Sequence, residues 1–121
     1  AVGSPSMNSI SGTSVNKVEQ YSQVFFSFPR RAGETGEYEF TFTAESPDRY
    51  NVDAYLKIND VWQRVSEGLA QGESPSATLN FSATEETGEI VVIVSNITDG
   101  NYDSDTSGWI GRGFSYDFKK L

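Results

Sequence analysis

Hydrophobic and polar residues alternate along most of the chain, and this period of two is typical of β-strands with one buried face. The segment EYEFTFTAE is the clearest example, because Tyr38, Phe40 and Phe42 fall on one side while Glu39 and Thr41 fall on the other. Turn-forming residues separate such segments, and no stretch of ten or more residues has helical periodicity. The pattern predicts strands at residues 23–28, 37–45, 51–58, 61–66, 77–83, 89–97 and 113–120.

About seven to eight short strands joined by turns indicate an all-β fold, an antiparallel β-sandwich of the jelly-roll or immunoglobulin-like type. Asn59 and Asp60 both tolerate positive φ, so they predict a two-residue hairpin turn. Residues 90–94 are apolar on both faces, which predicts a central strand that is covered on each side. Many Phe and Tyr residues fall on the inward positions, so the core is expected to be rich in aromatic rings.

The domain is expected to span residues 22–121, because residues 1–21 are rich in Ser, Gly and Asn and lack the alternating pattern. Those first residues are predicted to be a linker or loosely ordered leader, in which residues 15–18 add an edge strand. A polar loop is predicted at residues 67–76, where two glycines and a proline occur.

Composition excludes several functions. The chain has neither cysteine nor histidine, so thiolate metal sites, disulfides and Ser-His-Asp or Cys-His catalysis are ruled out. The net charge of −8 argues against nucleic acid, whose phosphates require a basic face. No apolar run is long enough for a membrane span. The composition favours a secreted or cell-surface domain, because Gly, Ser, Thr, Asn and Asp are plentiful and Lys is scarce. The glutamates in the turns are expected to be solvated rather than catalytic.

An acidic loop near the end of the chain is a candidate cation site. Asp99, Asn101, Asp103 and Asp105 occur at alternating positions, followed by Gly108. Calcium takes six to eight oxygen ligands, which such a loop supplies, although the glycine and the final acid of an EF-hand are missing. The same residues also suit a solvated turn, because Asp and Asn hydrogen-bond to their own backbone. Calcium binding and a plain acidic loop therefore remain open alternatives.

Four aromatic residues are candidates for ligand contact. Tyr55 lies on the outward side of its predicted strand, whereas Trp62, Tyr102 and Trp109 lie in or beside loops. Exposed Trp and Tyr rings stack on sugar rings or anchor a protein partner. Large rings at these places also cap the ends of a core, so two interpretations stay open for the tryptophans.

Six segments match, in the same order, the strands of a bacterial family. They are VFFSFP, YEFTFTAE, VDAYLKI, TLNFSA, GEIVVIVSN and GFSYDF. With them, residues 23–120 resemble the bacterial pre-peptidase C-terminal domain, a small β-sandwich appended to secreted peptidases and other exported hydrolases. Asp53, Tyr55 and Leu56 occupy the Asp, Tyr and apolar places of the most specific family element.

The chain departs from that family at Trp62 and in a longer last connection, residues 98–112, which contains the acidic loop. Domains of the family are non-catalytic accessories that help to export, anchor or target an attached enzyme, and some relatives bind calcium and fibrous or polysaccharide substrates. The resemblance therefore implies an accessory domain whose partners are an attached catalytic domain or an extracellular polymer.

Two further hypotheses belong to other classes. A carbohydrate-binding module predicts that Tyr55, Trp62 and Trp109 lie on one exposed face, whereas the accessory domain predicts partly buried or scattered rings. A structural or adhesive domain acting by strand addition predicts a long unprotected edge strand, completed by residues 15–18.

Overall fold

A computed structural model gives the fold and describes residues 9–13, 23–28, 30–31, 33–45, 47–97, 102–103, 108–109 and 114–121, with the backbone alone at 9–13, 102–103 and 108–109. All secondary structure in these residues is β-strand. The strands are β1 (Ser9–Thr13), β2 (Gln23–Phe28), β3 (Gly36–Ala44), β4 (Tyr50–Ile58), β5 (Val61–Ala70), β6 (Ser76–Ala83), β7 (Thr87–Asn96), β8 (Tyr102–Asp103), β9 (Gly108–Trp109) and β10 (Phe114–Lys120).

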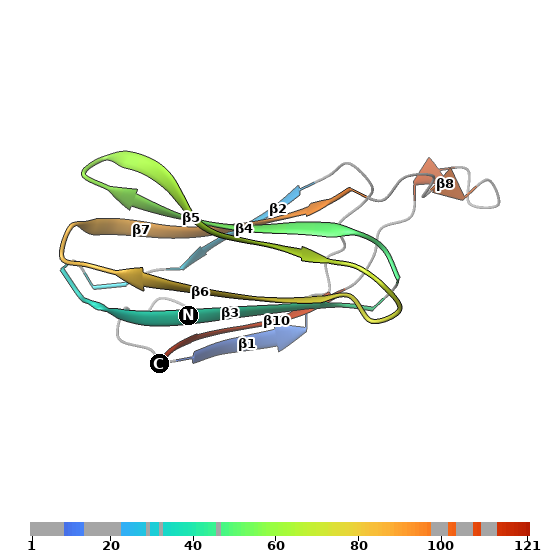
Figure 1. The fold of residues 1–121 in the computed structure, drawn as a ribbon, viewed down its shortest axis with the longest axis horizontal. Helices are drawn as coiled ribbons and strands as arrows, with labels where there is room; N and C mark the ends of the chain where they lie inside the picture. The colour runs from blue at the N-terminus through green and yellow to red at the C-terminus, as the bar shows by residue number, and fades with distance from the viewer. Residues whose placement is uncertain are drawn as a thin grey trace.

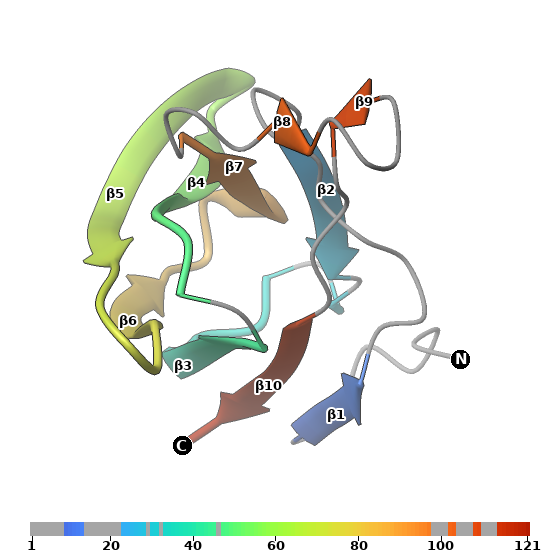
Figure 2. The same ribbon diagram turned by 90° about the vertical axis from the view of Figure 1, so that its right-hand side faces the viewer.

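Two antiparallel four-stranded sheets face each other, in the orders β1-β10-β3-β6 and β2-β7-β4-β5 (Figures 1 and 2). Among the described strands of these sheets, only β4 and β5 are consecutive in one sheet, and the chain otherwise alternates between the two. Eight strands arranged in this way form a jelly roll. The predicted antiparallel β-sandwich is therefore confirmed. The described residues contain no helix long and apolar enough to cross a membrane.

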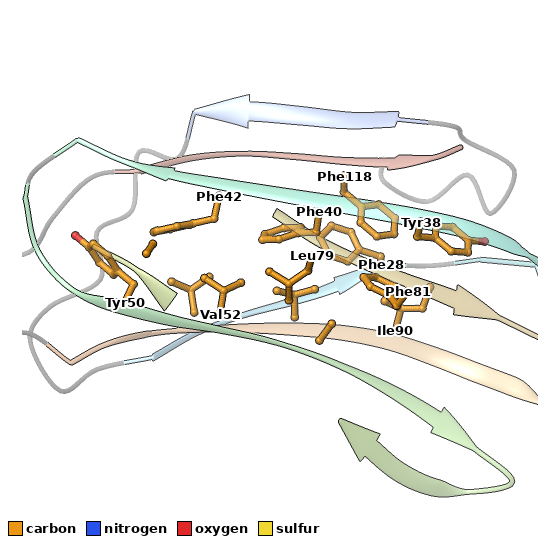
Figure 3. Packing of buried hydrophobic residues seen from close by; sticks show 14 of the residues in the cluster. Phe28, Tyr38, Phe40, Phe42, Tyr50, Val52, Leu79, Phe81, Ile90 and Phe118 are labelled. Atoms are coloured by element: carbon orange, nitrogen blue, oxygen red, sulfur yellow. The ribbon is translucent and has the colours of Figure 1, made fainter. Parts of the chain in front are cut away.

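Aromatic rings fill the space between the sheets, as the alternation predicted (Figure 3). Phe40, Phe42 and Tyr50 are all 0% exposed. The rings of Phe28 and Phe118 stack with centroids 3.9 Å apart, which joins the two sheets directly. Rings bury more apolar area than aliphatic side chains, so a core of this kind suits a small domain that has no disulfide.

The β4–β5 hairpin shows one confirmed prediction and one error. Asn59 and Asp60 have φ values of 50° and 64°, as the predicted two-residue turn requires. The return strand was expected to end at residue 66, but β5 continues to Ala70, so the first part of the predicted loop 67–76 is strand. Gly68 lies in this extended part, and a Cβ there would lie 3.3 Å from Ala77 Cβ, so the glycine permits a close approach of β5 to β6.

An edge strand is formed within the expected leader, at Ser9–Thr13. It pairs with β10, and Ile10 lies opposite Phe118. The edge strand was predicted at residues 15–18, which lie outside the described residues.

At the other end of the chain, Lys120 Nζ donates a hydrogen bond to Glu34 Oε2 at 2.7 Å, and this cation lowers the pKa of the Glu34 carboxyl.

Candidate binding face

The outer face of the sheet β2-β7-β4-β5 has an open apolar groove of about 330 Å³. We call this surface the outer aromatic face, and the side chains that line its groove are those of Phe25, Tyr55, Trp62, Val91 and Ile93. The groove lies within the size range of small-molecule sites.

Strand alternation places most of these side chains outside the core. Phe25 stands between the partly buried Val24 and Phe26, and its own side chain is 63% exposed. Tyr55 stands between Ala54 and Leu56, both buried in the core. Because successive side chains of a strand point to opposite faces, Phe25 and Tyr55 are directed to the same outer surface.

A β-bulge brings Trp62 to that surface. The pairing of β4 with β5 shifts between Ala54 and Tyr55, so that Val65 is an extra residue with no partner on β4. Without the shift, Trp62 would lie opposite the inward-facing Ile58; with it, Trp62 lies opposite Lys57. The hairpin tip bends away from the facing sheet beyond this point (Figure 1). The Trp62 residue is 44% exposed and lines the groove, which favours ligand contact over capping of the core.

The floor of the groove is made by β7, one of the two inner strands of the sheet. Its residues Val91 and Ile93 point outward and are only partly buried, while Ile90, Val92 and Val94 are buried in the core. The central position predicted for residues 90–94 is confirmed. The expected cover on the outer side is not observed among the described residues, where these two side chains line an open groove instead.

The charged side chains on the same face form ion pairs. Lys57 Nζ lies 3.6 Å from Glu89 Oε2. Arg64 lies 3.6 Å from a carboxylate oxygen of both Asp53 and Glu67. Lys57 Nζ also stands 5.7 Å from the centre of the Trp62 ring, within the range of a cation–π contact, which orients the indole.

The carboxyl of Asp53 on this face is partly buried, and its pKa is shifted. Burial raises its pKa, Arg64 opposes that effect, and Glu67 adds to it. Below the ordinary aspartate pKa of about 3.9, folded and unfolded chains both carry the proton and burial has no cost. As the pH rises, the unfolded chain ionises first, and the folded state loses stability until it ionises too.

Replacing Asp53 with Asn is therefore expected to raise the melting temperature at neutral pH, because the buried charge is removed. The gain should disappear near pH 3, where the native Asp53 is protonated as well. Thermal unfolding of both proteins at the two pH values checks this. A variant that melts below the native protein at pH 7 would show that the Arg64 ion pair outweighs burial.

The structure brings two of the four predicted contact residues together, Tyr55 and Trp62. Tyr102 and Trp109 are paired across the short β8–β9 hairpin, and their side chains are not among the described ones. The predicted calcium loop lies largely outside the described residues: of its four ligands, only the backbone of Asp103 is described, opposite Gly108. Among the residues that the structure does describe, no three acidic side chains are grouped to hold a metal ion.

Sequence reasoning missed Phe25, Val91 and Ile93 as parts of a site. The signal for Phe25 was present, because inward-facing Val24, Phe26 and Phe28 leave it on the wet side of its strand. The signal for Val91 and Ile93 was the run of residues 90–94, which is apolar on both faces of the strand. That pattern predicted that both faces are covered, whereas the outer face forms the floor of the groove.

Comparisons with solved structures agree with this fold. The mitogen YPM from Yersinia pseudotuberculosis matches with a TM-score of 0.61 at 11% identity, over 95% of this chain and 86% of that one. The globular domain of zebrafish complement 1qA protein matches at 0.56 and 12%, over 94% of each chain. PirA matches at 0.55 and 10%, over 100% of each. Carbohydrate-binding modules, one of them solved with calcium and xylotriose, match at 0.46 or less.

No family model matches the sequence, and no curated protein matches it either. Structural matches at such low sequence identity show that the β-sandwich fold is shared. They give no information about ligands. The sandwich implied by the resemblance to the pre-peptidase C-terminal domain is thus confirmed, whereas membership of that family stays a prediction.

Proposed function

We propose that the chain is a non-catalytic binding domain of an exported protein and that it holds a polysaccharide on the outer aromatic face. The observation that carries the proposal is the gathering of Phe25, Tyr55 and Trp62 along one groove of about 330 Å³, where Phe25 and Trp62 are exposed and Tyr55 is partly buried. Single exposed apolar residues are normal on a protein surface, but aromatic side chains gathered around a groove mark a binding site.

A carbohydrate suits this groove better than a purely apolar ligand. Aromatic rings pack against the apolar faces of sugar rings, while the hydroxyl groups of the sugar need polar partners nearby. Gln23, Ser95 and Asn51 supply these partners in one row beside the groove. Gln23 Nε2 donates a hydrogen bond to Ser95 Oγ at 3.0 Å, so the amide is already oriented toward the row.

The finer role that we propose is that of an accessory domain, which anchors or targets an attached secreted hydrolase to its polymer. Support comes from the resemblance to accessory domains of secreted hydrolases and from the acidic composition, a net charge of −8, which suits a soluble extracellular domain. Calcium at Asp99, Asn101, Asp103 and Asp105 remains part of this proposal as a stabiliser of the final loop. Catalysis is assigned to the attached enzyme.

The test is depletion of the protein from solution by insoluble cellulose, xylan, mannan and chitin. At least one of these polysaccharides is expected to retain the native protein. Tyr55→Ala should lose most of this retention, because the truncation removes one ring from the groove. Thr43→Ala, exposed on the opposite sheet, is the matched control and should bind as the native protein does. If none of the four polymers removes the native protein from solution, the proposal is contradicted.

A further inference from the structure

The three aromatic side chains of the groove lie on a diagonal across the strands. Phe25 on β2 shares a row of paired residues with Ile93 on β7 and Asp53 on β4. Tyr55 is the next outward residue along β4 after Asp53. Trp62 on β5 is opposite Lys57, which is the next outward residue after Tyr55.

The length of this diagonal can be obtained from sheet geometry. Three strand spacings separate β2 from β5, and two outward steps separate the row of Phe25 from the row of Trp62. With strands about 4.8 Å apart and outward residues about 6.8 Å apart along a strand, the Cα atoms of Phe25 and Trp62 are about 20 Å apart. No single sugar ring covers that distance.

The charges on the face indicate that the ligand is uncharged. Five charged residues project from the outer surface of this sheet, and each has a partner of opposite charge on the same surface; they are Asp53, Lys57, Arg64, Glu67 and Glu89. Both cations are therefore already paired, and the three acids exceed them by a single negative charge, because Arg64 is shared by Asp53 and Glu67. An anionic polymer would have to separate pairs that are already formed, and a polymer with many cations would find only one unbalanced carboxylate among them.

We propose that the ligand is an extended, uncharged polysaccharide chain that crosses the strands diagonally and contacts Phe25, Tyr55 and Trp62 in turn. Val91 and Ile93 form the apolar floor between the first two rings. The inference rests on the proposed function and deepens it, since it specifies a binding site for several consecutive sugar units rather than for one ring or a chain end. An open groove of this kind suits the interior of a chain rather than a chain end.

Calorimetric titration with linear oligosaccharides tests the inference. The probes are the dimers, tetramers and hexamers of cello-, xylo-, manno- and chito-oligosaccharides. In the series that binds, the hexamer is expected to bind at least about tenfold more tightly than the dimer, because only the longer chain reaches both ends of the diagonal. Affinity should change less than about twofold between low and high salt, since no charge is neutralised.

Phe25→Ala provides the specific test, because Phe25 stands at one end of the diagonal. We expect this variant to bind the hexamer about tenfold more weakly and the dimer unchanged. Leu69→Ala is the matched control, since Leu69 is an exposed apolar residue on β5 outside the groove, 43% exposed, and should bind every oligomer normally.

Each outcome separates the two proposals. Equal affinity for dimer and hexamer would overturn the extended chain and leave polysaccharide binding intact. The same conclusion would follow if Trp62→Ala lowered the affinity for the hexamer while Phe25→Ala did not. A strong salt dependence would overturn the uncharged ligand. Binding of no oligosaccharide, together with a native dimer that Trp62→Ala converts to a monomer in sedimentation, would overturn both and assign the face to a second copy.

Discussion

Replacing Phe40 with Ala is expected to lower the free energy of unfolding by about 3–5 kcal/mol, the usual cost of truncating a buried phenylalanine. Phe40 is 0% exposed and lies where the two sheets meet. Its ring centroid is 5.9 Å from those of Phe26 and Phe28 on the facing sheet, and 6.1 Å from that of Tyr116. Removing the ring leaves a cavity that these three neighbours fill only in part.

This loss is a large share of the total stability of a small domain, about 5–15 kcal/mol. Denaturant unfolding followed by fluorescence measures it. Phe25→Ala is the matched control, because the same residue type at 63% exposure should change the stability by about 0.5 kcal/mol or less. Equal losses for the two variants would contradict the assignment of inner and outer faces on which the site depends.

Replacing Trp62 with Ala is expected to have the largest effect on binding. Hot-spot aromatic residues contribute about 2 kcal/mol or more, which is close to a thirtyfold loss of affinity. The indole lies on the rim of the groove with Lys57 Nζ beside it, and it is exposed at 44%, so its removal opens no cavity in the core. Titration of the polysaccharide or oligosaccharide that retains the native protein measures the change.

Val61→Ala is the control for this variant. Val61 is the neighbouring residue of the same hairpin, 57% exposed and outside the groove, so its truncation should leave affinity unchanged. Both variants are expected to unfold close to the native midpoint. Undiminished binding by Trp62→Ala would exclude the indole from the site, and a matching loss in Val61→Ala would point to general disruption of the hairpin.

The sequence predicted the β3 and β4 strands well because each has one core face and one wet face. In β3, Tyr38, Phe40 and Phe42 are buried as expected, and the residues between them are not.

β5 was harder to predict for a physical reason. Its bulge at Val65 reverses the alternation in the middle of the strand, so the outward residues are Trp62 and Arg64 before it and Glu67 and Leu69 after it.

The binding face depends on long-range pairing that no local pattern reveals. Gln23 and Ser95 are 72 residues apart in sequence and hydrogen-bonded in the fold. The outward position of Tyr55 was predictable from its strand alone, but its proximity to Phe25 required knowing that β7 lies between β2 and β4. The four oxygen-bearing residues of the acidic loop stay a prediction, since their side chains lie outside the described residues.

Backbone amide chemical shifts measured by NMR during titration with the hexasaccharides show directly whether the outer aromatic face binds a polysaccharide. With at least one sugar, we expect saturable shifts concentrated at the groove, with little change on the opposite sheet; the groove residues are Phe25, Tyr55, Trp62, Val91 and Ile93. Shifts concentrated elsewhere, or none with any of the four hexasaccharides, would contradict polysaccharide binding at this face.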